Sequence, residues 1–156
     1  KQEVLITSRT PKDIKNFVDL KTAMDCEYLV IAIPAQEIRN WLKENFVFNG
    51  QKILVASKGI EASSGQFLNE IYADFVPTKN IGFISGPSFA TEVMQGLPCA
   101  LVINSTSKKL FKEFYSQRVK NPTFKIISPK EIFGNFWSPS FDRREGDLRI
   151  CCGLER

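Results

Sequence analysis

The chain has 156 residues, of which 43% are hydrophobic and 24% are charged, a balance that is ordinary for a folded domain and excludes bulk disorder. This length suits one compact domain with one hydrophobic core. The net charge of +4 is scattered except at Lys108, Lys109 and Lys112 and at the pair Arg143 and Arg144. A solvated helix surface explains the first group, and we expect no nucleic-acid site.

The ionisable residues limit the chemistry that the chain can perform. There is no histidine, which excludes Ser-His-Asp and Cys-His hydrolysis and leaves lysine, carboxylate, tyrosine or cysteine as acid or base. Four cysteines without a C-x-x-C pair predict no metal site, and Cys26 and Cys99 beside apolar runs indicate free thiols in a reducing compartment. No apolar run approaches about 18 residues. The start, KQEVLITSRT, shows no signal-peptide pattern, so we expect a cytoplasmic protein without a membrane span.

Six short runs rich in apolar and β-branched residues predict strands. They are VLITS (4–8), YLVIAIP (28–34), KILVAS (52–57), IGFISG (81–86), ALVINS (100–105) and FKIIS (124–128). Several are apolar at consecutive positions, which is typical of strands buried on both faces of a sheet. Three stretches between them, 35–46, 66–75 and 107–115, have the apolar spacing of helices, with Ser107 as the N-cap of the last. The alternation predicts parallel βαβ units, and we expect an α/β fold with a doubly wound, mostly parallel sheet.

The residues that follow the strands are the candidates for binding a ligand, because ligands of a doubly wound sheet bind where the carboxyl ends of the strands meet. Ser8 and Arg9 follow the first run, and a basic residue there accommodates the 2′-phosphate of NADP. An exposed arginine in a loop explains Arg9 equally well. Lys58, in ASKGIE, can pair with a phosphate or polarise a carbonyl, or it can be a solvated lysine in a turn.

The stretch ISGPSFATEVMQG, residues 84–96, combines a tight turn with a helix start. Gly86 allows the backbone to approach a ligand, Pro87 makes the turn rigid, and Ser88 can cap a helix. The exposed N–H groups from Ser88 to Ala90 suit a phosphate. A capped helix start without any ligand fits the same residues, so position alone leaves both interpretations open.

Three segments become specific when they are read together: LVIAIPAQEIRNWL, ILVASKGIEASSGQFLNEI and ISGPSFATEVMQGLPCALVI. In order and spacing they resemble the VPSQ, (S/T)KGIE and SGPSFA segments of the bacterial NAD(P)-dependent glycerol-3-phosphate dehydrogenases of phospholipid synthesis. The resemblance covers residues 1–116 and extends faintly over 117–134.

The resemblance implies reversible hydride transfer between NADP or NAD and the C2 position of dihydroxyacetone phosphate, which gives sn-glycerol 3-phosphate. It implies that Lys58 is a catalytic residue that touches both cofactor and substrate, and that Gly86 and Ser88 touch the substrate. By the same resemblance Ala90 touches the cofactor. Ser8 and Arg9 fall at the adenosine-ribose end of the cofactor, which favours NADP.

The chain departs from this family pattern in two places. The family opens with a strand and a GxGxWG turn that this sequence does not contain, so we expect a sheet without the first strand and the glycine turn. The family later carries a GALKN segment whose lysine transfers the proton, but IFGNFWSPSFDRREGDL agrees with that region only at Ile132 and Gly134. We therefore expect a partial Rossmann-like NAD(P)-binding domain over residues 1–134, a tail over 135–156 outside the family pattern, and no turnover by this chain alone.

Two rival interpretations remain. One is a related Rossmann dehydrogenase of the ketopantoate-reductase type, against which the succession of SKGIE and GPSFA argues. The other is a non-catalytic module that keeps the sheet and binds a nucleotide. The partners that we expect are the small-molecule substrate and a second copy of the chain in a homodimer. A sheet without its first strand has a bare region, which favours self-association or poor solubility over a designed function.

Overall fold

The computed structural model describes residues 4–86, 91, 94–97, 99–116 and 124–127, which contain a five-stranded sheet in the order β1-β2-β3-β4-β5. The strands are β1 (Tyr28–Ile31), β2 (Lys52–Val55), β3 (Ile81–Ser85), β4 (Cys99–Asn104) and β5 (Phe124–Ile127). β1 pairs with β2, β2 with β3, and β4 with β5 in parallel. The predicted α/β fold with a mostly parallel sheet is confirmed.

One pairing in the mostly parallel sheet is antiparallel. β3 and β4 run in opposite directions, with Ser85 opposite Val102 and Phe83 opposite Asn104, so their connection is not one of the predicted parallel βαβ units. An antiparallel pair needs no crossover to the other edge of the sheet. The connection over 86–98 therefore starts and ends at the sheet edge where β3 ends.

The predicted first strand, VLITS, is also wrong. Within residues 4–18 the structure has an isolated bridge between Ile6 and Phe17, held by hydrogen bonds from Ile6 N to Asn16 O (2.9 Å) and from Val18 N to Ile6 O (2.8 Å). Val4 and Ile6 remain exposed. The strand preference of β-branched residues is realised by packing against neighbours, and among the described residues this run pairs only with Phe17 and not with β1, the strand at that end of the sheet.

The helices are α1 (Leu20–Met24), α2 (Ala35–Asn45), α3 (Leu68–Ala73), the 3-10 helix η1 (Thr78–Asn80) and α5 (Lys108–Ser116). The three predicted helices are confirmed, and Ser107 caps α5 by accepting a hydrogen bond from Leu110 N at 3.2 Å. α3 begins two residues later than predicted, where the Glu70 carboxylate accepts from Phe67 N at 2.7 Å. α1 was not among the predicted helices; Asp19 caps it by accepting a hydrogen bond from Thr22 N at 2.8 Å.

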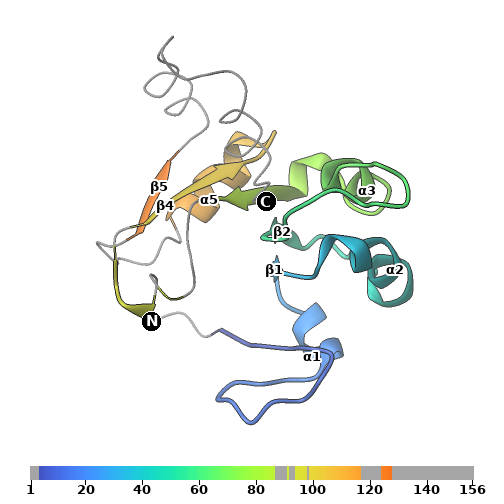
Figure 1. The fold of residues 1–156 in the computed structure, drawn as a ribbon, viewed down its shortest axis with the longest axis horizontal. Helices are drawn as coiled ribbons and strands as arrows, with labels where there is room; N and C mark the ends of the chain where they lie inside the picture. The colour runs from blue at the N-terminus through green and yellow to red at the C-terminus, as the bar shows by residue number, and fades with distance from the viewer. Residues whose placement is uncertain (1–3, 87–90, 92–93, 98, 117–123, 128–156) are drawn as a thin grey trace.

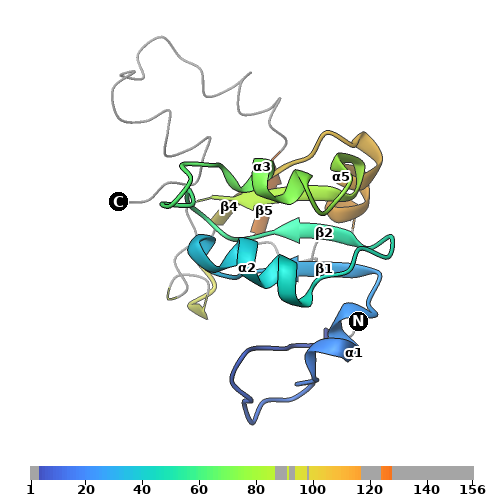
Figure 2. The ribbon, with the colours of Figure 1, turned by 90° about the vertical axis from the view of Figure 1, so that its right-hand side faces the viewer.

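The sheet divides the apolar core into two clusters, where length alone predicted one. Ile53 and Val55 on β2 pack with α2 and α3, whereas Leu54, between them, packs with Leu110 and Phe114 of α5. Neighbouring side chains of a strand point to opposite faces, so one buried strand serves both clusters. Figures 1 and 2 show α2 and α3 on one face of the sheet and α5 on the other.

An ionic cluster fixes α5 to the start of β1 and β2. Lys52 Nζ lies 2.7 Å from Glu27 Oε1 and 3.0 Å from Glu113 Oε2, and it donates a hydrogen bond to the Tyr28 hydroxyl at 3.0 Å. These partners, Glu27 first, raise the pKa of Lys52 above its ordinary value. The cluster lies at the amino ends of the parallel strands, opposite the edge where Lys58 lies.

Candidate functional site

Two of the predicted site residues meet at the carboxyl ends of β2 and β3. Lys58 follows β2, Gly86 follows β3, and the two strands are parallel neighbours, so both residues leave the sheet at the same edge. Lys58 Nζ donates a hydrogen bond to the carbonyl oxygen of Gly86 at 3.4 Å. A cation is therefore placed at the edge where ligands of such sheets bind.

Gly86 has a backbone conformation that other residues rarely adopt. Its φ is +156°, and a residue with a Cβ atom would be strained at such a positive φ. The glycine in ISGPSFA is thus explained by the turn that leaves β3. The predictions for Ser88 and Ala90 fall on residues outside the described part of the chain, so they remain predictions.

The loop after Lys58 is fastened to α2 by side chains on one helix face. Gln36 Nε2 donates to Ile60 O at 2.8 Å, and Gln36 Oε1 accepts from Ala62 N at 2.8 Å. Three residues further along α2, Arg39 binds the Glu61 carboxylate through Nε and Nη2 at 2.8 to 3.0 Å. Positions three apart lie on the same side of a helix, so both side chains reach the loop.

Glu61 is the buried member of this cluster. Its exposed fraction is 4%, and it also accepts a hydrogen bond from Ser64 Oγ. The hydrogen bonds from Arg39, and then that from Ser64, hold the pKa of the Glu61 carboxyl below its ordinary value of 4.5. Glu61 is a structural anion of the loop, because its oxygens are occupied by Arg39 and Ser64.

The structure does not bring Ser8 and Arg9 to this edge. Ser8 Oγ donates to Thr10 O at 2.6 Å, and both residues are exposed in the segment before α1 (Figure 1). Among the described residues, no hydrogen bond or ion pair joins either of them to Lys58 or Gly86. Their predicted contact with the adenosine ribose stays a prediction.

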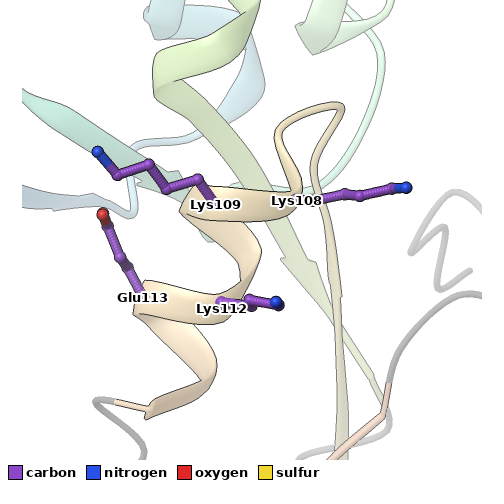
Figure 3. A pocket seen from close by; sticks show the side chains of 4 residues that line it. All are labelled: Lys108, Lys109, Lys112 and Glu113. Carbon is purple, nitrogen blue, oxygen red and sulfur yellow. The ribbon is translucent and has the colours of Figure 1, made fainter.

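A shallow hollow on the molecule lies elsewhere, along α5. It is lined by Lys108, Lys109, Lys112 and Glu113. In Figure 3, Lys109 and Glu113 point to one side of the helix and Lys108 and Lys112 to the other, as expected for residues four apart. The lysines belong to an exposed helix surface, as predicted, and none of the predicted site residues lines this hollow.

The described part of the chain contains no group of cysteine and acidic residues that could hold a metal ion. Cys26, which is half-buried, is a free thiol. In the same part of the chain, no helix is long and apolar enough to cross a bilayer.

The site residues that sequence reasoning missed are Gln36 and Arg39. Gln36 follows the second apolar run but was assigned no role above, and neither Arg39 nor Glu61 was singled out. Their spacing offered a signal, because Gln36 and Arg39 share a helix face and Glu61 follows Lys58 by three residues.

Comparison with known proteins decides the family. A sequence model of the NAD-dependent glycerol-3-phosphate dehydrogenase N-terminus matches residues 1–111. The chain belongs to this family. The match decides against the ketopantoate-reductase alternative and confirms the resemblance carried by the SKGIE and GPSFA segments.

Individual relatives agree with this family. The glycerol-3-phosphate dehydrogenase [NAD(P)+] of Sulfurimonas denitrificans is 55% identical over 139 residues, which are 87% of this chain and 47% of the relative. The protein of the same name from Campylobacter lari is 43% identical over 139 residues, or 87% of this chain and 46% of the relative. The chain therefore spans about half the length of the curated relatives it matches.

Two solved structures support the fold. The glycerol-3-phosphate dehydrogenase of Coxiella burnetii matches with a TM-score of 0.58 at 24% identity, over 80% of this chain and 38% of that one. The Plasmodium falciparum enzyme matches with a TM-score of 0.59 at 21% identity, over 74% of this chain and 34% of that one. At these identities the likeness concerns the fold of the family's Rossmann-like domain.

Proposed function

We propose that the chain is the cofactor-binding part of an NAD(P)-dependent glycerol-3-phosphate dehydrogenase that reduces dihydroxyacetone phosphate to sn-glycerol 3-phosphate for phospholipid synthesis. The observation that carries this proposal is the pairing of Lys58 Nζ with Gly86 O at the carboxyl edge of the parallel strands. Family membership supports the reaction type, and the geometry supports the place where it occurs.

In this proposal Lys58 is the catalytic cation. Reduction of a ketone builds negative charge on its oxygen, and a fixed positive charge nearby lowers the energy of that transition state. The nicotinamide cofactor, when bound, supplies the hydride. Lys58 would contact both cofactor and substrate, Gly86 and Ser88 would hold the substrate, and Ala90 would lie against the cofactor.

The residues at this edge fit an anionic dinucleotide. Gly86 has a φ of +156°, a conformation that favours glycine, so the backbone directly after β3 carries no side chain at the strand end. Ser8 and Arg9 are proposed for the ribose end, where a guanidinium favours NADP over NAD. The 156 residues contain no G-x-G-x-x-G turn, so we expect this chain to hold the nucleotide weakly.

The proposal is tested with a hybrid enzyme. Residues 4–116 of this chain replace the aligned segment of the Sulfurimonas denitrificans relative, and NADPH oxidation is followed with dihydroxyacetone phosphate. We expect the hybrid to turn over the substrate and the 156-residue chain not to, since no lysine follows Lys130 to transfer the proton. A folded hybrid without activity would contradict the proposal.

We also propose a cytoplasmic location and a homodimer. The free thiol of Cys26 supports a reducing compartment. The dimer is supported by β1, which ends the strand order and exposes Val30, whose exposed fraction is 66%. Light scattering during size-exclusion chromatography of the chain distinguishes a dimer from a monomer and from larger aggregates.

A further inference from the structure

Gln36 holds the loop after Lys58 with both ends of its side-chain amide. The donor Nε2 bonds to Ile60 O and the acceptor Oε1 bonds to Ala62 N, each at 2.8 Å. An amide that uses its donor and its acceptor on one short loop fixes the direction of that loop as well as its distance. The two bonds cross from α2 to the chain immediately beyond Lys58.

Lys58 thus lies between two anchored backbone segments. Before it, Ala56 N donates to Ile31 O at 2.8 Å and Ser57 Oγ reaches the same oxygen at 3.5 Å, so the chain is tied to β1. After it, Gly59 turns the chain at a φ of +115° toward Ile60. With both neighbours held, the Cα–Cβ direction of Lys58 is set by the backbone.

We propose that Gln36 is a positioning residue for Lys58. By holding Ile60 and Ala62 it fixes the turn at Gly59, which aims the Lys58 side chain across the strand ends to Gly86 O. Its consequence for catalysis rests on the proposed function, whereas its consequence for the direction of Lys58 rests on the hydrogen bonds alone.

The Arg39–Glu61 pair makes this role separable from folding. It fastens the far half of the loop, with Gln66 Oε1 as a further acceptor for Arg39 and with Glu61 N donating to Gln66 O at 3.0 Å. When Gln36 alone is changed, these contacts keep the loop closed. The near half, from Lys58 to Ala62, is the part that loses its attachment.

The first test uses the full 156-residue chain without ligand. Gln36→Met keeps the side-chain length and removes both hydrogen bonds, and Asn40→Ala is the matched control, an exposed amide of α2 with no hydrogen bond among the described residues. With 13C-labelled lysine, NMR relaxation reports the order of the Lys58 ε-carbon, assigned by its loss in Lys58→Met. Amide hydrogen exchange reports Ala62.

In Gln36→Met we expect the Lys58 ε-carbon to become as mobile as that of exposed Lys43, and Ala62 exchange to rise on the order of fivefold because one hydrogen bond is lost. Asn40→Ala should change neither. If Ala62 exchange rises while Lys58 keeps its order, Gln36 is only structural and the proposal is wrong. Unchanged signals at both residues would also overturn it.

The second test uses the hybrid enzyme. Gln36→Met should lower kcat by about tenfold with a smaller change in KM, because a misdirected cation chiefly costs transition-state stabilisation. In a Lys58→Met background the same change should have no further effect, whereas independent effects would contradict positioning. An inactive parent hybrid would instead refute the proposed function, and the NMR test would still decide the role of Gln36.

Discussion

Lys58 Nζ lies 3.4 Å from the carbonyl oxygen of Gly86, which joins the loops that follow two neighbouring parallel strands. The residues are 28 positions apart in sequence, and the parallel register of β2 and β3 brings them together. The carbonyl oxygen accepts a hydrogen bond from the ammonium, so the Lys58 head group is held beside the start of the loop that follows β3. The contact therefore defines the centre of the candidate site.

The Arg39–Glu61 pair predicts how stability changes with acid. Because the pKa of Glu61 is lower in the folded chain than its ordinary value of 4.5, the pair stabilises the fold above pH 4.5. This stabilisation is lost as the pH falls through the folded pKa. We expect Glu61→Gln to lower the urea midpoint of unfolding at pH 7. Below pH 4.5 the midpoint of this variant should decrease less with falling pH than that of the parent chain.

The matched control is Glu44→Gln on the exposed face of α2, where the described residues give Glu44 no ion pair. Its urea midpoint should follow the parent chain at every pH. If Glu61→Gln also follows the parent chain between pH 3 and 7, the Arg39–Glu61 pair does not contribute as described.

Gly59→Ala tests the turn beside Lys58. Gly59 has a φ of +115°, and an added Cβ would lie 3.4 Å from the Cβ of Ala35, so the strain comes mainly from the backbone. We expect the free energy of unfolding to fall by about 1 to 2 kcal/mol. The hybrid enzyme should also lose activity, since the turn would redirect Lys58.

Gly50→Ala separates strain from function. Gly50 also has a positive φ, +85°, with open space around it and a position before β2, away from the Lys58 edge. In chemical denaturation Gly50→Ala should lose about as much unfolding free energy as Gly59→Ala, whereas the hybrid enzyme that carries Gly50→Ala should keep its kcat. Equal kinetic losses in the two variants would show that Gly59 has no special place in the site.

Tyr72 carries a buried hydroxyl without a hydrogen-bond partner among the described residues. The side chain is 0% exposed, and its ring packs edge-on against Phe83 at 6.3 Å between centroids. Burial raises the pKa of Tyr72 above its ordinary value of 10.0. Tyr72→Phe keeps the ring and should raise the free energy of unfolding by about 1 kcal/mol.

Tyr28→Phe is the opposite control. The Tyr28 hydroxyl accepts a hydrogen bond from Lys52 Nζ at 3.0 Å, so its removal should lower stability in the same urea titration. If Tyr72→Phe destabilises the chain as Tyr28→Phe does, the Tyr72 hydroxyl has a partner and the account of this core is wrong.

The parts of the fold that follow from local pattern were predictable. The runs at 28–34, 52–57 and 81–86 are apolar at consecutive positions and form strands that begin within them. The run at 4–8 has the same composition but lies outside the sheet, since a strand also requires a partner to pair with. The antiparallel direction of β4 was not predicted, because the residue types of a strand do not encode whether it runs parallel or antiparallel to its neighbour.

The candidate site was predictable only in part. Lys58 and Gly86 were found because residues after buried strands share an edge once the strands are parallel. Gln36, Arg39 and Glu61 were assigned no role because each is ordinary on a helix or loop surface, and their roles arise from contacts across 22 to 26 positions. Such contacts depend on the packing of α2 against the loop.

The central claim is that Lys58 at this edge is the cation on which the reaction depends, and Lys58→Met in the hybrid enzyme tests it most directly. The control is Lys79→Met, an exposed lysine of η1 at the opposite end of β3. Steady-state kinetics with NADPH and dihydroxyacetone phosphate should show kcat/KM lower by about 10²-fold or more in Lys58→Met and unchanged in Lys79→Met. A folded Lys58→Met hybrid that keeps the parent kcat/KM would contradict the account.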